Sequence, residues 1–346
     1  FSKLAYSTLL DRFSWHRDVL SAEVTGTSFT AAFDHPQQIN AGDLNVGYVD
    51  IGPKDGQPVI LLHGWPYDIH SYAEVAPALA AKGYRVIVPS LRGYGTTRFL
   101  SAKTPRNGQP SAMAEDIVNL MDALNIKQAV FAGYDWVPAP RTSLRRCGQN
   151  ALITRFGEWV SHQQPTDWQT TVAAKAEQQW WYQFYFATER GAEGYAKNTH
   201  DFARLIWSQA SPDWKFSDAT FNASAKSLDN PDHVAVTLSN YRWRLGLEKG
   251  ERKYDSYEKK LAALPNITVP TITIEGGNNG ARIGTTGLRG KFTGKYEHRT
   301  FGATVGHNPP QEDPQDSLTL WSTQITLKCA IFNTLPFSLE ISVEHI

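Results

Sequence analysis

A short apolar run ends abruptly at the most informative point of this chain. Ala129-Val130-Phe131-Ala132 leads directly into Gly133-Tyr134-Asp135-Trp136. Four apolar residues closed by a glycine are typical of a buried strand, and a Gly-x-Asp-x sequence after such a strand predicts a sharp turn that lifts the Asp135 side chain above the sheet. A carboxylate presented in this way can attack an electrophilic carbon and form an ester.

Further apolar runs alternate with stretches of helical spacing. Strands are expected at Leu44–Ile51, Val59–Leu62, Arg85–Pro89, Ala129–Ala132 and, later, Thr271–Ile274. Ser111 is expected to cap a helix with an apolar face, and Gly83 to close a helix over residues 73–82. This alternation predicts an α/β fold with a mostly parallel central sheet flanked by helices.

The alternation stops after the Asp135 turn. Residues 165–255 are rich in Trp, Tyr, Gln and charge at helical spacing, which predicts an all-helical cap inserted into the core. The predicted organisation is an N-terminal extension (1–35), a first core part (36–164), the cap (165–255), a second core part (256–316) and an atypical C-terminal tail (317–346).

Composition excludes some classes of partner. The 346 residues include 34 Lys and Arg and 34 Asp and Glu, so no net field favours nucleic acid or an anionic membrane surface. No apolar run approaches the roughly 18–20 residues of a membrane span. The high aromatic content suits a large core and equally an apolar pocket. Localisation stays open, with the cytoplasm as the default, and so does the oligomeric state.

Two other segments supply the groups expected around Asp135. His63-Gly64-Trp65-Pro66 follows a buried strand, so it lies at the carboxyl edge of the sheet, where ligands bind in α/β folds. The backbone N–H groups of Trp65 and Trp136 are expected to form an oxyanion hole, although an ordinary turn with a buried His63 is the alternative. Late in the chain, Gly306-His307-Asn308 offers His307 as the base.

Together these motifs resemble the epoxide hydrolases of the α/β-hydrolase superfamily, the branch with an Asp nucleophile that is related to haloalkane dehalogenases. The resemblance rests on the motifs at 61–66, 91–95, 133–136 and 306–307 and continues into the predicted cap. There, Trp181-Tyr182-Gln183-Phe184-Tyr185-Phe186 and Asn240-Tyr241-Arg242 are similar to the family's two tyrosine motifs. The similarity places these tyrosines at Tyr182 and Tyr241.

The resemblance implies hydrolysis of a small apolar epoxide to a vicinal diol, with water as the second substrate and no metal or organic cofactor. Asp135 would attack an epoxide carbon while Tyr182 and Tyr241 donate to the opening oxygen, and His307 would activate water to hydrolyse the ester. A haloalkane or haloacid dehalogenase would instead need N–H donors for a halide. A non-catalytic, ligand-binding relative of the α/β-hydrolases is the third alternative.

The chain departs from the family pattern where the acid of the triad belongs. The family has a carboxylate on the loop after the Thr271–Ile274 strand, and this chain has Gly277 at the matching position. Glu275 lies nearby but in a register that directs it along the strand, which makes it a weak substitute. By analogy with triads whose acid is altered, turnover is expected to fall on the order of 10²–10⁴-fold. The ester would then form but hydrolyse slowly.

The segment after Trp136 lacks the small side chains that such a turn requires. Val137-Pro138-Ala139-Pro140 fits poorly into the start of a helix. Residues 137–151, back-translated and read one nucleotide earlier, can encode a small-residue turn and an amphipathic helix, and residues 156–164, read one nucleotide later, can encode a buried strand. Our hypothesis is that residues 137–164 and 317–346, with 281–289 as a third candidate, are frameshifted relative to a working enzyme.

Overall fold

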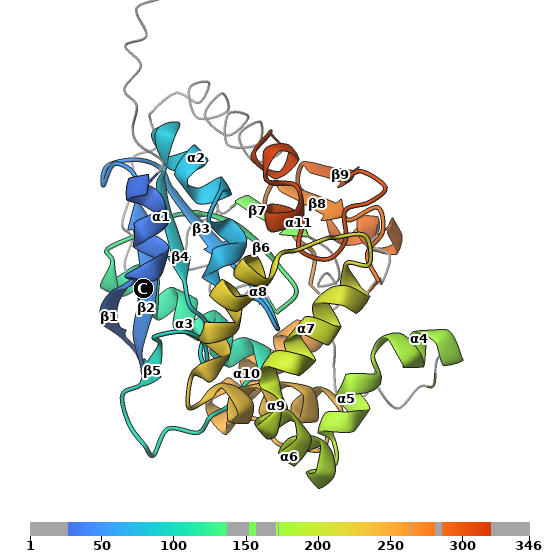
Figure 1. The fold of residues 1–346 in the computed structure, drawn as a ribbon. Helices are drawn as coiled ribbons and strands as arrows, with labels where there is room; N and C mark the ends of the chain where they lie inside the picture. Colours follow the sequence, from blue (N-terminus) through green and yellow to red (C-terminus); the bar gives the residue numbers. More distant parts are fainter. Residues whose placement is uncertain are drawn as a thin grey trace, which may run out of the picture.

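A computed structural model describes residues 27–136, 152–156, 171, 173–263, 265–280 and 286–319. The described strands form one nine-stranded sheet (Figure 1). Its strands are β1 (Gln37–Ala41), β2 (Leu44–Ile51), β3 (Pro58–Leu62), β4 (Arg85–Pro89), β5 (Arg98–Phe99), β6 (Val130–Tyr134), β7 (Leu152–Phe156), β8 (Thr271–Glu275) and β9 (Tyr296–Thr300).

The sheet is mixed but mostly parallel. Its order is β1-β2-β4-β3-β6-β7-β8-β9, with β5 paired to β2. All pairings from β4 to β9 along this order are parallel, whereas the pairings of β2 with β1, β4 and β5 are antiparallel. The central strands are apolar because both faces of a parallel sheet are covered, and four of the five residues of β3 are buried. The expected fold class is confirmed.

All five expected strands are present, and β1, β5, β7 and β9 were not predicted. β1 and β9 lie at the two ends of the sheet order and are largely polar, and only Ala41 is buried among their residues. Edge strands of this kind carry no apolar run, so the pattern gave no signal. β7 pairs with β6 and β8 in the frame as given, within one of the segments interpreted as frameshifted.

The described helices begin with α1 (Thr27–Asp34), η1 (Ile69–Tyr72), α2 (Val75–Ala81) and α3 (Pro110–Ala123). Gly83 follows α2 with φ 88°, as a helix-closing glycine should. The expected cap at Ser111 is wrong, because α3 begins at Pro110 and its N-cap is Gln109. The Ser111 N–H instead donates to Glu258 Oε1 at 3.1 Å, so a distant carboxylate satisfies the helix start.

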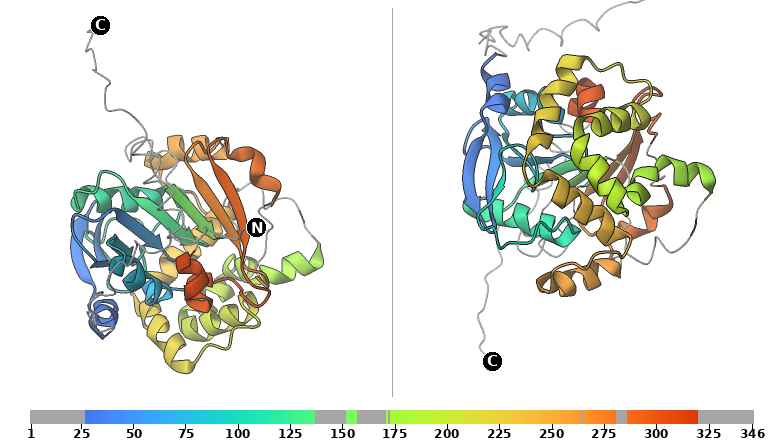
Figure 2. Two further views of the ribbon diagram at one scale, coloured as in Figure 1. Left: turned by 90° about the horizontal axis from the view of Figure 1, so that it is seen from above. Right: turned by 60° about the horizontal axis from the view of Figure 1, so that its bottom comes forward.

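Only helices, and no strand, occur among the described residues between β7 and β8. They are α4 (Ala174–Gln179), α5 (Trp181–Phe186), α6 (Glu189–Lys197), α7 (Thr199–Ala210), α8 (Asp218–Ala225), η4 (Lys226–Asp229), α9 (His233–Arg244), η5 (Arg252–Tyr254) and α10 (Asp255–Ala262). Most of them gather on one side of the sheet (Figures 1 and 2). None of the described helices is long and apolar enough to cross a membrane. The boundaries of the cap stay a prediction.

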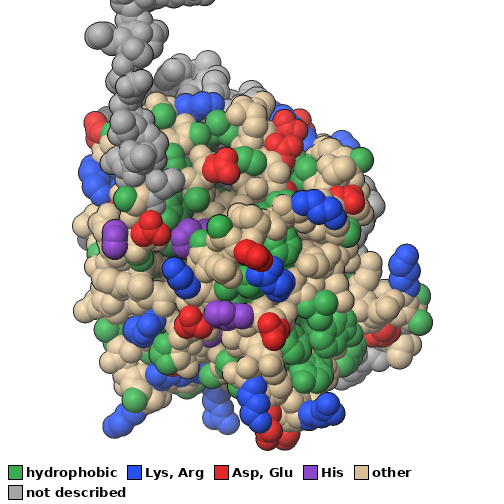
Figure 3. Space-filling model, viewed as in Figure 1, with side chains coloured by type: hydrophobic (Ala, Val, Ile, Leu, Met, Phe, Trp, Pro, Cys, Tyr) green, Lys and Arg blue, Asp and Glu red, His purple; other side chains and the backbone are tan. Residues whose placement is uncertain are grey.

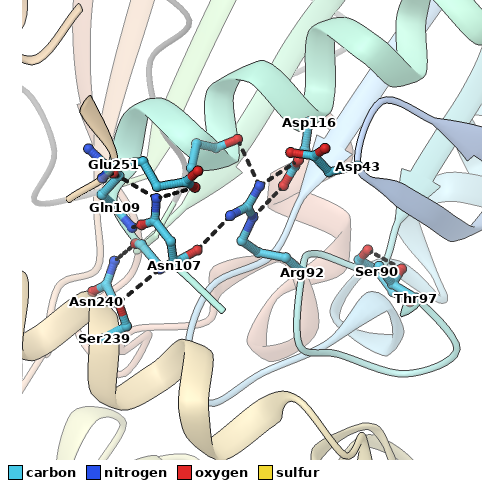
Figure 4. Close-up of polar contacts among 12 residues, drawn as sticks. Asp43, Ser90, Arg92, Thr97, Asn107, Gln109, Asp116, Ser239, Asn240 and Glu251 are labelled. Carbon is cyan, nitrogen blue, oxygen red and sulfur yellow. Dashed lines mark hydrogen bonds and ion pairs between the residues drawn. The ribbon is translucent and has the colours of Figure 1, made fainter. Parts of the chain in front are cut away.

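A buried polar network fastens this helical insertion to the core (Figure 4). Arg92 Nε and Nη2 donate to the two oxygens of Asp116 at 2.6 and 2.7 Å, and its Nη1 donates to the Asn107 carbonyl at 2.6 Å. From the insertion, Asn240 Nδ2 donates to the Gly108 carbonyl at 2.5 Å. The loop before α3 is therefore held from the sheet side by Arg92 and from α9 by Asn240.

Charges of both signs are interspersed over the face seen in Figure 3, in line with the balanced composition. Apolar side chains gather over α5 and α7, where Phe184 and Leu205 are 40% and 44% exposed.

Most of the frameshift hypothesis concerns residues 137–151, 157–164, 281–285 and 320–346, which lie outside the described residues. It therefore stays a hypothesis.

Candidate active site

Asp135 stands at the tip of the sharp turn that follows β6. Its φ is 58°, a left-handed conformation that is uncommon for a residue other than glycine and clusters at functional sites. A Cβ on Gly64 would overlap the Asp135 side chain, so the loop after β3 approaches the carboxylate this closely only with glycine at that position. The Trp65 N–H donates to Asp135 Oδ1 at 2.7 Å.

The second oxygen of Asp135 faces His307. His307 Nε2 lies 3.4 Å from Asp135 Oδ2, and the His307 residue is 6% exposed. The two carboxylate oxygens thus have separate partners, a backbone amide on Oδ1 and an imidazole on Oδ2. Segments 172 residues apart in the sequence meet here, as the carboxyl edge of a parallel sheet predicts.

The two tyrosines adjoin each other beside this carboxylate. The ring centroids of Tyr182 on α5 and Tyr241 on α9 are 5.4 Å apart, and both rings contact Trp65, at 4.9 and 5.4 Å. The Trp136 indole donates to the Tyr241 hydroxyl at 3.2 Å. Because that oxygen accepts from an indole, its own hydrogen is left for another acceptor. Burial raises the pKa of Tyr241, so the phenol stays protonated at neutral pH.

A cavity of about 270 Å³ opens onto these groups. Asp135, His307, Trp65 and Tyr182 line it, together with apolar side chains such as Ile206 from α7. Tyr241 adjoins two of these residues and is not itself among the lining residues found in the described part of the chain. The cavity therefore leaves room for a small molecule beside Asp135, with one phenol in its wall.

The position of the expected acid lies on the turn after β8. Gly277 is exposed, and a Cβ there would overlap the Gly302 carbonyl oxygen and Ala303 Cα. A side chain at 277 would therefore require a rearrangement of this backbone. Glu275 is buried at the end of β8, where its carbonyl accepts from the Phe301 N–H at 2.8 Å. Its role as a substitute acid stays a prediction.

Known proteins that are similar to this chain share its fold. The family model for the alpha/beta hydrolase fold matches residues 57–136. A solved structure from Klebsiella pneumoniae, of a protein provisionally named an epoxide hydrolase, is 64% identical, with a TM-score of 0.79, over 84% of this chain and 97% of that chain. This chain belongs to the epoxide hydrolase family.

More distant relatives of this epoxide hydrolase family member match shorter stretches. Mouse bifunctional epoxide hydrolase 2 is 34% identical over 126 residues, which are 33% of this chain and 22% of the mouse protein. A haloalkane dehalogenase from Mycobacterium marinum is 30% identical over 127 residues, 34% of this chain and 39% of that protein. The chain thus spans less than half the length of these curated relatives.

The sequence analysis missed a carboxylate that accepts hydrogen bonds from the loop carrying His307. Glu312 ends the short helix α11 (Pro309–Glu312). Its Oε2 accepts from the Gly306 N–H at 2.6 Å, and its Oε1 accepts from the Asn308 N–H and from Ser211 Oγ, both at 2.7 Å. Glu312 follows the N-cap residue Asn308 by four residues, one more than the spacing of a capping box, so no recognised motif pointed to it.

The sequence analysis also missed a chain of buried hydrogen bonds that begins at the Trp65 indole. The Trp65 indole donates to the Tyr195 hydroxyl at 2.8 Å, and that hydroxyl lies 2.6 Å from His233 Nε2. His63, the alternative buried histidine, is fully buried, and its Nε2 accepts from the Leu91 N–H at 3.2 Å. His63 therefore packs within the core, while the Trp65 N–H two residues later binds Asp135.

Proposed function

We propose that this chain hydrolyses small apolar epoxides to vicinal diols through an ester on Asp135. The contact between Asp135 Oδ2 and His307 Nε2, at the base of a small cavity with a phenol in its wall, carries this proposal. It pairs a nucleophile with a base and adds a donor for the leaving oxygen.

In the first step Asp135 attacks an epoxide carbon. The Trp65 N–H holds Oδ1, which leaves Oδ2 as the attacking oxygen. A new bond forms between Oδ2 and carbon while the carbon–oxygen bond of the ring breaks. Tyr182 and Tyr241 donate hydrogen bonds to the emerging alkoxide, one of the two phenols passes its proton to that oxygen, and the resulting phenolate is reprotonated from solvent. The Trp136 indole, by donating to Tyr241, directs the phenol hydrogen away from itself.

In the second step water cleaves the ester. His307 Nε2 takes a proton from water as the oxygen attacks Cγ of Asp135, and negative charge develops on Oδ1. That oxygen already accepts from the Trp65 N–H at 2.7 Å, and the backbone N–H of Trp136 is the second proposed donor. The ester bond then breaks, the product alkoxide takes the proton from His307, and the diol leaves. The Asp135 carboxyl group, which now carries the other hydrogen of the water, releases it as a proton to solvent and is again a carboxylate.

The indole groups disfavour the dehalogenase alternative. A halide needs N–H donors, and the two indoles beside Asp135 already donate to phenols, Trp65 to Tyr195 and Trp136 to Tyr241. Halide binding would require both of these hydrogen bonds to break. The contact of His307 with Asp135 counts against a purely ligand-binding protein, which needs no base beside a carboxylate.

One experiment separates the three alternatives. The protein is incubated with styrene oxide and, separately, with a 1-haloalkane, while diol, halide and intact protein mass are followed. Diol, or a mass increase equal to the epoxide, is expected with styrene oxide and is expected to vanish in Asp135→Ala. The exposed carboxylate Asp122 on α3 gives the matched control Asp122→Ala, which should behave as the wild type. Halide release, or ligand binding with neither adduct nor diol, would overturn the proposal.

A further inference from the structure

One carboxylate binds the backbone amides of three successive residues at His307, two of them directly and one through a serine hydroxyl. Glu312 accepts directly from the amides of Gly306 and Asn308. The amide between them, that of His307, donates to Ser211 Oγ at 2.9 Å, and Ser211 Oγ donates onward to Glu312 Oε1 at 2.7 Å. The backbone on both sides of the His307 side chain is therefore fixed to one anion.

These contacts exceed what the start of α11 needs. A helix cap would account for the Asn308 amide, since Asn308 is the N-cap residue. It does not account for Gly306, which lies before the helix, or for Ser211, the C-cap residue of α7 in the helical insertion. A Cβ on Gly306 would overlap Ser211, so the loop and the insertion approach closely at this point.

The same carboxylate supplies negative charge near His307. Burial raises the pKa of Glu312, whereas the hydrogen bonds from Ser211, Gly306 and Asn308 and the charge of His307 oppose that rise. The attraction is mutual, so an ionised Glu312 favours the imidazolium form of His307. Among the other described groups that face the imidazole are Asp135 at 3.4 Å and the rings of Tyr67 and Tyr134, at 5.8 and 6.0 Å between centroids.

We propose that Glu312, with Ser211 as its relay, is the positioning residue of His307 in this chain. It fixes the backbone that carries the imidazole and provides a negative charge for the imidazolium that forms as water is deprotonated. Both tasks belong to a triad acid, and position 277 holds a glycine. This role rests on the proposed hydrolysis, in which His307 acts only in the second step.

The step at which His307 acts gives the test a specific signature. In Glu312→Gln the side chain keeps its size but loses its charge, and an amide N–H₂ replaces one acceptor. With styrene oxide, the ester should form at the wild-type rate, whereas its decay, followed by intact mass, should slow at least about tenfold. The imidazole pKa of His307, followed by NMR and assigned with His307→Asn, should fall by roughly half a unit or more.

Two further variants separate positioning from folding. Ser211→Ala removes the relay but keeps the charge, so ester decay should slow while the His307 pKa changes little. Asp316→Asn neutralises an exposed carboxylate four residues further along and should leave both quantities unchanged. Wild-type decay together with a wild-type His307 pKa in Glu312→Gln would reduce Glu312 to a helix cap and overturn the proposal. A wild type with neither adduct nor diol would overturn the proposed function, and the His307 titration would then decide the role of Glu312 alone.

Discussion

Acidification is expected to destabilise this protein through one buried imidazole. His233 Nδ1 lies 3.0 Å from the Gly93 carbonyl, which can only accept, so Nδ1 carries the proton. His233 Nε2 is then the nitrogen that accepts from the Tyr195 hydroxyl, 2.6 Å away, while that hydroxyl accepts from the Trp65 indole. Burial lowers the pKa of His233 to about 4. Protonation of Nε2 would therefore break an ordered chain of donors and acceptors.

The size of the effect follows from the two protonation states. An unfolded chain binds a proton at His233 below about pH 6.5, and the folded chain does so only below about pH 4. Between these values the unfolded state holds more protons, so stability falls as the pH falls. At 1.36 kcal/mol per pKa unit the full effect is about 3 kcal/mol, of which about 2.5 kcal/mol is lost between pH 7.5 and 4.5.

Urea denaturation at several pH values between 7.5 and 4.5 measures this loss. His233→Gln is expected to be less stable than the wild type at neutral pH, yet its free energy of unfolding should depend less on pH, by about 2.5 kcal/mol over this range. The exposed His35 supplies the control His35→Gln, whose profile should run parallel to the wild type. If His233→Gln loses as much stability on acidification as the wild type, the reasoning is wrong.

Three other substitutions test contacts around the site. Gly64→Ala places a Cβ against Asp135, and we expect the rate of ester formation, followed by intact mass, to fall about 10²-fold. Tyr241→Phe leaves the buried Trp136 indole without its acceptor, so the free energy of unfolding should fall by about 1–3 kcal/mol and ester formation should slow by roughly 10²–10⁴-fold. Arg92→Met leaves a buried carboxylate unpaired and should cost about 3–5 kcal/mol in urea denaturation. An unchanged rate or stability in any of them would contradict the contact concerned.

The sequence predicted the parts of the fold whose signal is local. Strands such as β3 and β6 are continuous buried runs, and the turn at Asp135 follows one of them directly. The polar edge strands β1 and β9 had no such run, because their side chains are largely outside the core. The error at Ser111 has a tertiary cause, since its amide bonds to a carboxylate 147 residues away.

In the candidate site, too, the residues with a local sequence signal were predicted and the residues without one were not. Asp135 and His307 lie in glycine-flanked segments after buried strands, and the structure brings them within 3.4 Å of each other. Ser211 had no recognisable motif, because its partner Glu312 is 101 residues distant and the two meet only once the insertion folds over the sheet. Single-sequence reasoning identifies residues that carry chemistry more readily than residues that hold them in place.

Trp65 connects the core to the helical insertion, which recombination between relatives could otherwise replace independently of the core. Its backbone amide binds Asp135, and its indole binds Tyr195 on α6. Recombination with a relative whose insertion has no hydroxyl at position 195 would remove the indole's acceptor, and with it a constraint on the amide beside the nucleophile. Chimeras joined within the loops that flank the insertion should therefore work only when positions 65 and 195 come from the same parent. Across relatives, these two positions are expected to covary.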